Sequence, residues 1–474
     1  MPEPKTMKIG LDAVPKPLME VLAQLPDSYL VGGCVRDLML GLKPSDYDTE
    51  VFGVTYEGLQ KKLEKFGNAE LVGSSFGTLK LWRPGEKKEY DFALPRREIK
   101  RDRGHKGFEV IHHSDITMRD AAIRRDFTMN ALYLDPRTGE VIDHFNGITD
   151  LQQGKLRHVS DAFREDPLRV LRGMRFISRF DLTADPETVE LCRSIKDTFK
   201  ELPKPRLWGE WVRWALQSVR LSSGLKFLQE TEWLKHFPEM AGLVGVPQDP
   251  SHHPEGDAFT HTCHVCDALA ETPEWQQAPA ERKAALMFAA VSHDFGKAVS
   301  TVIENGRIIS HGHEETGLPL AESFLSSIDA PNEIREVVVP LVRYHMVRNP
   351  KPDDRWIRRM AIKVAPATLQ ELATLITADH FGRPPKPRIV PVEAAKMRER
   401  AQELKVDQQA PKPMLQGRHL IARGMKPGSR MGEVLKAAFE AQINGEFADE
   451  QGAGKWLDAQ LQPQPSTKHP NEIS

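Results

Sequence analysis

The chain has 474 residues, with 65 Lys and Arg, 67 Asp and Glu, and 40% hydrophobic residues. This length and apolar content allow two to four domains with real hydrophobic cores, which excludes a small scaffold held together by disulfides or metals. The formal net charge of -2 excludes a globally basic nucleic-acid-binding protein, so any RNA contact must come from local basic patches.

The sequence shows no signal for secretion or membrane insertion. It holds no apolar run of about 18 residues or more, and its N-terminal residues lack a charged-then-apolar layout. We therefore expect a cytoplasmic protein with no membrane partner. The cysteines are too few for a disulfide framework in a chain of this length, so we expect them to be reduced. They are Cys34, Cys192, Cys263 and Cys266.

Residues 1–155 mix short strand-like runs with helical stretches and glycine-rich turns, a pattern typical of an α/β or α+β unit. The run LVGGCVRD predicts a strand that ends at Gly32 and Gly33, followed directly by a helix. Paired glycines let the backbone approach a phosphate closely, and Arg36 adds a charge-assisted donor. The run therefore indicates a phosphate-binding turn.

A second strand is expected to carry Asp46 and Asp48 in the run SDYDTEVFG. Residues two apart on a strand point to the same face, which places the two carboxylates side by side. Such carboxylates repel each other unless a cation bridges them, and Mg²⁺ prefers one or two carboxylates together with substrate phosphates. The pair predicts a Mg²⁺ site for phosphoryl transfer, and two solvated aspartates on a surface strand are the alternative.

Helical periodicity dominates from about residue 156. The segment DPLRVLRGMRFISRF, residues 166–180, begins with an acidic residue and a proline and interleaves arginines with apolar residues, as an amphipathic helix does. Its apolar positions include Leu168, Leu171, Met174 and Phe176. Further on, Trp208, Trp211 and Trp214 stand three residues apart, which favours a buried helix face over stacking on RNA.

Several motifs in a fixed order carry a resemblance to a known family. They are GGCVRD with DYD, RRDFTMNAL at 124–132, DHFNGITDL at 143–151 and EDPLRVLRGMRF at 165–176. In these the chain resembles the bacterial and eukaryotic class II CCA-adding tRNA nucleotidyltransferases of the polymerase-β-like superfamily. The resemblance implies an α+β fold, in which a mixed-sheet catalytic head (1–155) precedes an all-α neck, body and tail.

The resemblance also implies roles for individual residues. Asp46 and Asp48 would hold the catalytic Mg²⁺, with Asp91 as a third catalytic carboxylate, and Arg125, Asp126 and Asn130 would grip the sugar and triphosphate. The helical neck (156–225) would select the nucleotide. The complete expected nucleotide-binding set is Gly33, Arg36, Arg125, Asp126, Asn130, Asp166, Arg169, Arg172 and Arg175.

Asp166 and Arg169 carry the expectation about base selection. Three residues apart on a helix, they would project together and present an acceptor beside a donor pair. Cytosine and adenine complement that pattern, whereas uracil and guanine reverse it and would leave buried polar groups unpaired, at about 1 to 3 kcal/mol apiece. The pair predicts selection of CTP and ATP, and an ordinary i, i+3 ion pair at a helix start is the alternative.

Three related activities share such a head: full CCA addition, partial CC or A addition, and poly(A) synthesis. The basic stretch between Asp91 and Arg124, which includes 96–106, resembles the flexible loop of A-incorporating members, and VGSSFGTLKL at 72–81 lacks the arginine-rich form of bacterial poly(A) polymerases. We expect addition of CCA to the 3′ end of tRNA from CTP and ATP with release of pyrophosphate. A poly(A) polymerase or an A-adding enzyme is the alternative.

A second group of residues resembles an HD phosphohydrolase domain over about 250–385, within a helical body at 226–400. It consists of His261, His293, Asp294 and Asp379, and the pair HD directly follows a helix-like apolar run at 281–291. Imidazoles and carboxylates from separate helices converge on a divalent ion, here Mg, Mn, Ni or Co, whose bound water attacks a phosphoester. The resemblance implies phosphatase, 2′-nucleotidase and 2′,3′-cyclic phosphodiesterase activities.

The remaining histidines and cysteines of this region are weighed separately. His311 and His313 are candidates to complete the site or to bind phosphate. His252, His253, His264 and His345 are expected to be structural, as most lone helix histidines are. Cys263 and Cys266 form a single C-x-x-C without a second pair, so helix packing is favoured over zinc.

A rival hypothesis from another class is an enzyme that acts mainly as an HD hydrolase of RNA 3′ ends, with the head as an RNA-binding module. The metal carboxylates argue against it, because a binding module has no use for them. Residues 401–474 predict a small helical C-terminal unit whose role stays open and whose final residues are disordered. The sequence does not predict an oligomeric state.

Overall fold

The computed structural model describes residues 4–72, 77–95, 97–100, 108–111 and 116–462. Its contacts divide the chain into two units, 1–241 and 242–474, which are described separately. The basic stretch at 96–106, part of the run at 72–81 and the tail at 463–474 lie wholly or partly outside the described residues, so the expectations placed on them stay predictions.

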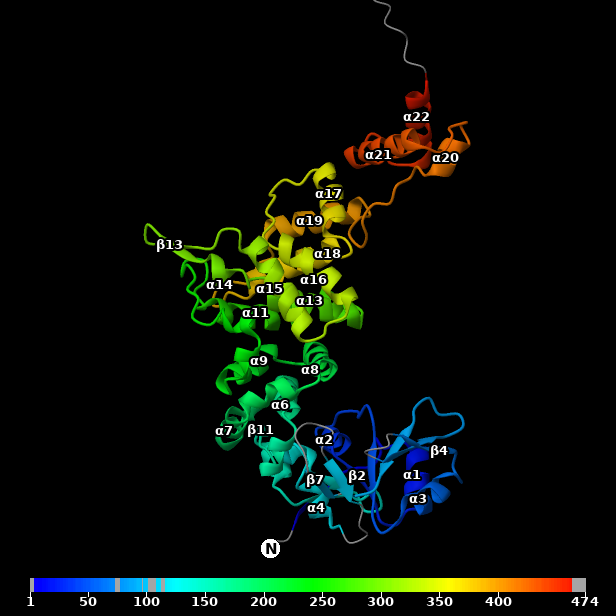
Figure 1. The fold of residues 1–474 in the computed structure, drawn as a ribbon, viewed down its shortest axis with the longest axis vertical. Helices are drawn as coiled ribbons and strands as arrows, with labels where there is room; N and C mark the ends of the chain where they lie inside the picture. Colours follow the sequence, from blue (N-terminus) through cyan, green and yellow to red (C-terminus); the bar gives the residue numbers. More distant parts are fainter. Residues whose placement is uncertain (1–3, 73–76, 96, 101–107, 112–115, 463–474) are drawn as a thin grey trace, which may run out of the picture. The chain divides into compact units, whose positions relative to one another are not determined.

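A mixed β-sheet forms the first part of unit 1 (Figure 1). Its strands are ordered β1-β10-β9-β2-β3-β6-β5-β4, with β3 and β6 parallel and the other neighbours antiparallel. They are β1 (Lys5–Lys8), β2 (Ser28–Val31), β3 (Asp48–Val51), β4 (Asn68–Val72), β5 (Thr78–Trp82), β6 (Tyr90–Ala93), β9 (Tyr133–Leu134) and β10 (Glu140–Asp143). A separate hairpin pairs β7 (Arg97–Lys100) with β8 (Phe108–Ile111).

The alternation of side chains along β3 decides which residues are available for chemistry. Thr49 and Val51 are buried, and Val51 belongs to a core that includes residues of α1 (Lys16–Leu22) and α3 (Tyr56–Leu63). Because successive strand residues point to opposite faces, Asp48 and Glu50 lie on the other face of the sheet. The candidate metal carboxylate therefore stands away from this core.

The rest of unit 1 is mainly helical, apart from a two-stranded parallel sheet of β11 (Lys155–Leu156) and β12 (Thr183–Ala184), and α6 has the predicted amphipathic form. The helices are α2 (Gly33–Met39), α4 (Met118–Ala122), α5 (Gly147–Gln152), α6 (Leu168–Phe180), α7 (Pro186–Ser194), α8 (Lys204–Gln217), α9 (Leu221–Glu230) and α10 (Pro238–Ala241). The predicted apolar positions of α6 are all buried. Gly224 of α9 packs directly on α6, because a Cβ there would lie 2.2 Å from Ser178 Oγ. Trp211 and Trp214 are fully buried, which confirms the predicted core face for these two residues, whereas Trp208 is half-buried.

Unit 2 is helical apart from a short hairpin, β13 (Val302–Glu304) and β14 (Arg307–Ile309). Its larger part contains α11 (Ala258–Ala270), α12 (Pro273–Gln277), α13 (Ala280–Ser292), α14 (Lys297–Ser300), α15 (His313–Ser327), α16 (Asn332–Tyr344), α17 (Asp354–Val364), α18 (Leu369–Phe381) and α19 (Val392–Glu403). Helix α13 is buried from Ala284 to Ser292, as the apolar run predicts.

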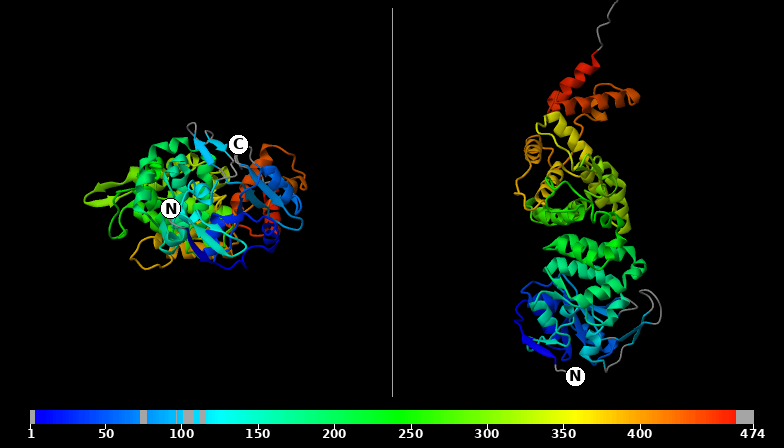
Figure 2. Two further views of the ribbon diagram at one scale, coloured as in Figure 1. Left: turned by 90° about the horizontal axis from the view of Figure 1, so that it is seen from below. Right: turned by 90° about the vertical axis from the view of Figure 1, so that its left-hand side faces the viewer.

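The C-terminal helices have a small core of their own. Helices α20 (Gly417–Ile421), α21 (Ser429–Asn444) and α22 (Glu450–Leu461) pack together around Leu420, Met431 and Leu457 (Figure 2). The predicted α+β architecture, a sheet-containing head followed by helices, is confirmed. Within the described residues, no helix has both the length and the apolar content needed to cross a bilayer.

Candidate functional sites

A cavity of about 430 Å³ in unit 1 is lined by every residue of the expected nucleotide-binding set and by Asp48. Those residues come from α2, the start of β3, the segment after α4, and the segment formed by α6 and the residues just before it, which are far apart in the sequence. Its lining also contains Gly32 of the predicted phosphate-binding turn, Phe176, which was predicted only as an apolar helix position, and Arg206, which the sequence analysis did not select. The fold thus gathers the predicted nucleotide-binding residues in one place.

The three candidate carboxylates lie near the ends of β3 and β6. Asp48 begins β3 and is in register with Asp91 of the parallel strand β6, so the two residues are direct neighbours across the sheet. Asp46 lies two residues before the strand, so the prediction that one strand carries both Asp46 and Asp48 is wrong. The reason is that the partner strand β2 ends at Val31, opposite Asp48, and leaves Asp46 without a ladder partner.

Electrostatics at Asp48 suit a cation. Its side chain is open to solvent on one side, but the protein atoms around the rest of it desolvate the carboxylate and raise its pKa. Arg125 opposes this rise in pKa, and the negative charges of Asp91 and Asp46 add to it. A divalent cation bound among these three carboxylates would relieve their mutual repulsion.

Arg125 is fixed beside these carboxylates. Its Nη2 donates to Glu50 Oε1 at 2.7 Å and its Nη1 donates to the Asn130 carbonyl oxygen at 3.1 Å. Gly32 has a φ of +74°, and a Cβ built there would lie 2.9 Å from Arg125 Nη1. The positive φ therefore favours glycine at this turn, and the guanidinium of Arg125 packs closely against it.

Asp126 organises a polar network in the wall of the cavity. It accepts from Arg172 Nε at 2.7 Å and from Asn130 Nδ2 at 3.0 Å, while Asn130 Oδ1 accepts from Arg36 Nη1 at 2.6 Å. Burial by itself would raise the pKa of Asp126, but Arg172, Asn130 and Arg169 outweigh burial and lower that pKa to about 2. The carboxylate therefore stays ionised and holds Arg172 at the cavity wall.

Asp166 and Arg169 differ from the predicted pair in their local structure. Asp166 has extended backbone and precedes Pro167, the N-cap of α6, so it does not lie on the helix. Its Oδ2 accepts from Arg206 Nη2 of α8 at 2.8 Å. Arg169 donates to the carbonyl oxygens of Ala162, at 2.7 Å, and Arg124, at 2.5 Å. The two side chains line the same cavity but are held by separate partners.

Two other cavity arginines are also anchored by carboxylates. Arg36 is buried and contacts Asp37 Oδ1 through Nε at 2.9 Å. Arg175 Nε donates to the buried Glu210 at 2.7 Å, and burial lowers the pKa of Arg175 to about 10. These carboxylates hold the guanidinium groups in place without removing them from the cavity lining.

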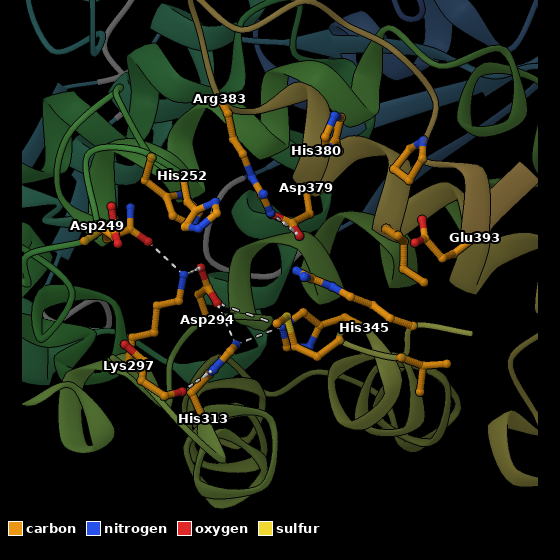
Figure 3. A pocket seen from close by; sticks show the side chains of 18 of the residues that line it. Asp249, His252, Asp294, Lys297, His313, His345, Asp379, His380, Arg383 and Glu393 are labelled. Carbon is orange, nitrogen blue, oxygen red and sulfur yellow. Dashed lines mark hydrogen bonds and ion pairs between the residues drawn. The ribbon is translucent and has the colours of Figure 1, made fainter. Parts of the chain in front are cut away.

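A second cavity, of about 640 Å³, lies in unit 2 (Figure 3). Asp294, Asp379 and His313 line it, and Lys297 and Arg383 add positive charge. His261 and His293 are fully buried behind this lining. All of the predicted HD residues therefore meet at or beside one cavity.

Their ligand atoms converge from three separate helices. His261 Nε2 of α11 lies 3.0 Å from Asp379 Oδ1 of α18 and 3.6 Å from Asp294 Oδ2. His293 Nε2, at the end of α13, lies 3.2 Å from Asp294 Oδ2. His261, His293 and Asp294 form a group whose ligand atoms all lie within 4.8 Å of one another, close enough to hold a metal ion.

Both carboxylates of this cluster are ionised. Burial by itself would raise the pKa of Asp294, but His293 and Lys297 outweigh burial and hold that pKa well below its ordinary value. Burial by itself would also raise the pKa of Asp379. Arg383 and His261 outweigh burial and hold that pKa well below its usual range. Buried ionised carboxylates facing imidazole nitrogens are a ligand set that suits a divalent transition metal.

His345, which was expected to be structural, lies in a group of residues that could hold a metal ion. Its Nε2 lies 3.2 Å from His313 Nε2 and 3.9 Å from Asp294 Oδ1, so it belongs to the cluster, as does the candidate His313. His345 ends α16 as His293 ends α13, and each donates from Nδ1 to the carbonyl oxygen three residues earlier. The sequence signal that could have identified His345 is therefore its position at the end of an apolar helix, which it shares with His293.

Glu255 is a further residue that the sequence analysis missed. Its Oε1 lies 2.7 Å from His261 Nδ1 and 2.8 Å from His253 Nδ1. Burial by itself would raise the pKa of Glu255, but hydrogen bonds from the two histidines lower it to about 2. A carboxylate on Nδ1 fixes the hydrogen there and turns His261 Nε2 towards the cluster, as the outer partner of a metal-binding histidine does.

The other histidines and the cysteines stay outside these groups. His252 and His311 line the cavity, and His264 is half-buried on α11. All four cysteines are buried and free of disulfides. In the part of the chain that the structure describes, the ligand groups close enough to share a metal contain no cysteine, in keeping with the packing role expected for Cys263 and Cys266.

Comparison with known proteins gives two family matches. Residues 28–157 match the Poly A polymerase head domain, and residues 316–453 match the family described as tRNA nucleotidyltransferase domain 2, putative. The chain is 35% identical over 435 residues to the Multifunctional CCA protein of Xanthomonas campestris pv. campestris strain B100, covering 88% of this chain and 97% of the relative. The chain belongs to the CCA-adding tRNA nucleotidyltransferases.

Solved structures show that the fold extends over nearly the whole of this CCA-adding family member. The Bacillus stearothermophilus CCA-adding enzyme in complex with CTP matches with a TM-score of 0.63 at 20% identity, covering 94% of this chain and 98% of that one. The Thermotoga maritima CCA-adding enzyme complexed with tRNA matches with a TM-score of 0.57 at 18% identity, covering 98% and 100%. The expected family and the expected class of enzyme, a nucleotidyltransferase, are both confirmed.

Proposed function

We propose that the unit 1 cavity adds C, C and A to the 3′ end of tRNA from CTP and ATP, with release of pyrophosphate. The observation that carries this proposal is the meeting of Asp48, which is in register with Asp91 on the neighbouring strand, with Arg125 and Arg172 at one cavity. An attacking hydroxyl and a triphosphate require these two kinds of group side by side. Full CCA addition is favoured over poly(A) synthesis by the similarity to the Multifunctional CCA protein.

Asp46, Asp48 and Asp91 are proposed to hold Mg²⁺. Their clustered negative charge, which raises the pKa of Asp48 further, fits a hard divalent cation. The bound metal supplies charge for in-line attack of the RNA 3′-hydroxyl on the α-phosphate. Arg125 lies next to these carboxylates, where its guanidinium can bind the triphosphate and neutralise the charge of departing pyrophosphate.

Base selection is assigned to Asp166 and Arg169. Asp166 offers an acceptor for the exocyclic amino group of cytosine or adenine, and Arg169 offers a donor for the adjacent ring nitrogen. Arg206 orients the Asp166 carboxylate by its ion pair at 2.8 Å. The present acceptors of Arg169 are backbone carbonyls, which compete with a base less strongly than a carboxylate would.

The test uses purified full-length protein, Mg²⁺ and three tRNA transcripts that lack CCA, CA or A. Each labelled nucleotide is offered in turn, and the expected result is completion of CCA followed by a stop. Asp48→Ala should abolish incorporation, while Asp161→Ala, whose side chain is 92% exposed, serves as the matched control. Long adenosine tails would contradict the proposal and favour a poly(A) polymerase.

For unit 2, we propose a divalent-metal phosphohydrolase that acts on phosphoesters such as 2′-phosphates and 2′,3′-cyclic phosphates. The supporting observation is the convergence of His261, His293, Asp294 and Asp379 beside a cavity that also carries Lys297 and Arg383. A metal held there (Mg, Mn, Ni or Co) supplies an activated water. Lys297 and Arg383 would bind the phosphate oxygens.

Phosphate release from 2′-phosphorylated and 2′,3′-cyclic nucleotides, measured with each metal in turn, tests this second activity. His293→Ala should remove it. Release that persists in His293→Ala would contradict the assigned site. Absence of any release, with intact nucleotide incorporation, would leave unit 2 as a helical support and contradict the hydrolase proposal.

The four-part division of the chain stays a proposal: head 1–155, neck 156–225, body 226–400 and C-terminal unit 401–474. The rival in which the head only binds RNA is disfavoured by the carboxylates on its sheet, which suit a metal and would repel RNA phosphates. Loss of incorporation in Asp48→Ala with unchanged tRNA binding would separate catalysis from binding and exclude that rival.

A further inference from the structure

The sheet face that carries Asp48 also carries Glu50 and Tyr133. Asp48 and Glu50 stand two residues apart on β3, so their side chains lie on the same face. Val31 of β2 is in register with Asp48 on one side and with Tyr133 of β9 on the other. Residues directly opposite each other on neighbouring strands point to the same face, so the Tyr133 side chain lies on the face of the two acids.

Both carboxylate oxygens of Glu50 accept hydrogen bonds. Oε1 accepts from Arg125 Nη2 at 2.7 Å, and Oε2 accepts from the Tyr133 hydroxyl at 2.8 Å. The other acceptor of that hydroxyl, the Met118 carbonyl oxygen, lies farther away, at 3.1 Å. Glu50 thus stands between a guanidinium and a phenol, which distinguishes it from the candidate metal ligand Asp48.

Three further contacts fix the plane of the Arg125 guanidinium. Its Nη1 donates to the Asn130 carbonyl oxygen at 3.1 Å, and its Cζ lies 5.4 Å from the centre of the Tyr133 ring. The backbone at Gly32 packs against the same group, because a Cβ there would lie 2.9 Å from Nη1. A guanidinium bound at both Nη atoms and stacked over an aromatic ring keeps one orientation, whereas a solvated arginine samples many rotamers.

The orientation of Arg125 matters because of the cavity that it faces. Arg125 lines the nucleotide cavity together with Asp48, whereas Glu50 and Tyr133 lie outside that lining. A guanidinium that is already fixed can neutralise developing negative charge without the cost of ordering a mobile side chain during the reaction. Glu50 and Tyr133 can therefore influence the reaction without touching the nucleotide.

We propose that Glu50 and Tyr133 are positioning residues of the nucleotidyl-transfer reaction. Tyr133 fixes the Glu50 carboxylate, and Glu50 in turn fixes the Arg125 guanidinium towards the triphosphate of the bound nucleotide. The inference rests on the proposed role of Arg125 in binding the triphosphate and neutralising the departing pyrophosphate. The three residues come from β3, β9 and the segment after α4, so the tertiary structure alone brings them together.

The test measures incorporation of labelled CTP by the full-length protein on a tRNA transcript that lacks CCA. Glu50→Gln keeps the size of the side chain but removes the charge that holds Arg125, so kcat/KM for CTP should fall by roughly 10- to 100-fold. Tyr133→Phe removes only a hydroxyl, and the expected fall is about 3- to 10-fold. The KM for tRNA should not change, because Arg125 is assigned to the nucleotide. Circular dichroism of each variant excludes unfolding as the cause.

The same substitutions in an Arg125→Ala background distinguish positioning from a structural role. Glu50→Gln should add no further loss to Arg125→Ala, because the group that it positions is already gone. Isothermal titration of CTP binding gives the same comparison where incorporation is too slow to measure. The matched controls are Glu70→Gln, at an exposed position of β4, and Tyr29→Phe, whose ring centre lies 6.4 Å from that of Tyr133. Both controls should keep the wild-type kcat/KM.

The outcomes separate this inference from the proposed role on which it rests. Wild-type kcat/KM in Glu50→Gln, together with a large loss in Arg125→Ala, overturns the positioning role and leaves the role of Arg125 standing. Equal losses from Glu50→Gln with and without Arg125 also overturn it, since Glu50 would then act on another group. An unchanged Tyr133→Phe overturns the part assigned to Tyr133. Full activity in Arg125→Ala overturns the proposed role of Arg125 and this inference with it.

Discussion

The two cavities of this protein differ in the charged groups that surround them. The unit 1 cavity is lined by arginines that are anchored by buried carboxylates such as Asp126, Glu210 and Asp37, so fixed positive charge surrounds a few acids at the end of a sheet. The unit 2 cavity is built from imidazoles and two ionised carboxylates, Asp294 and Asp379. The first arrangement suits an anionic nucleotide, and the second suits a metal cation.

The means of positioning differ as well. In unit 1, strand register and guanidinium–carboxylate pairs place the groups, so each arginine depends on a charged partner. In unit 2, the backbone carbonyls near helix ends fix the histidine tautomers, so the rings depend on helix geometry. Replacement of a carboxylate that anchors an arginine should therefore disturb the charge balance of the unit 1 cavity. Replacement of a histidine in unit 2 should remove a candidate metal ligand.

The largest expected effect is a separation of the two activities. Asp46→Ala plus Asp48→Ala should lower nucleotide incorporation by roughly a thousandfold, because loss of metal binding costs several kcal/mol of transition-state stabilisation. His293→Ala should lower phosphate release by a similar factor. Each variant is assayed for both activities, and a variant that loses both would contradict the existence of separate sites.

The next effect concerns the orientation of His261. Glu255→Gln weakens the acceptor on His261 Nδ1 and should lower the metal affinity of unit 2 by about 10- to 100-fold. Isothermal titration with Mn²⁺ in the Asp46→Asn plus Asp48→Asn background measures it. Glu322→Gln, an exposed residue of α15, is the matched control. Unchanged affinity would limit Glu255 to a packing role.

A smaller effect is expected on nucleotide choice. Arg169→Ala removes one half of the proposed base contact, so discrimination of CTP and ATP against UTP and GTP should fall by roughly tenfold. Single-nucleotide incorporation with each triphosphate provides the ratio of kcat/KM values. Arg164→Ala, which alters a 47% exposed arginine near the same segment, should leave the ratio unchanged. Continued rejection of UTP and GTP by Arg169→Ala would contradict the base-contact proposal.

The smallest effect is on stability at low pH. The pKa of Asp126 is about 2 in the folded protein, below its ordinary value near 3.9, so ionised Asp126 stabilises the fold at neutral pH. This contribution is present above about pH 4 and is lost as pH falls towards about 2. After allowance for the partly exposed Arg172, it amounts to about 1 kcal/mol. Asp126→Asn should flatten the pH dependence of urea unfolding in that window.

Local structure could be predicted wherever the residues of one short segment were sufficient to indicate it. The turn at Gly32, the amphipathic form of α6 and the buried helix that leads to His293 all follow from spacing within short windows. Two predictions about residues near these segments are wrong. Asp46 falls outside β3 because β2 ends at Val31, and Asp166 precedes α6, whose first residues follow Pro167.

The sequence by itself determined the family, the class of fold and the main chemical groups, because its motifs are contiguous and their order is specific. Only the tertiary structure decided the partners: Arg206 for Asp166, Asp91 for Asp48, and His345 and Glu255 for the HD cluster. Each of these contacts joins segments from different elements. Spacing along the chain carries no information about such distances, whereas strand register and the packing of helix ends fix them.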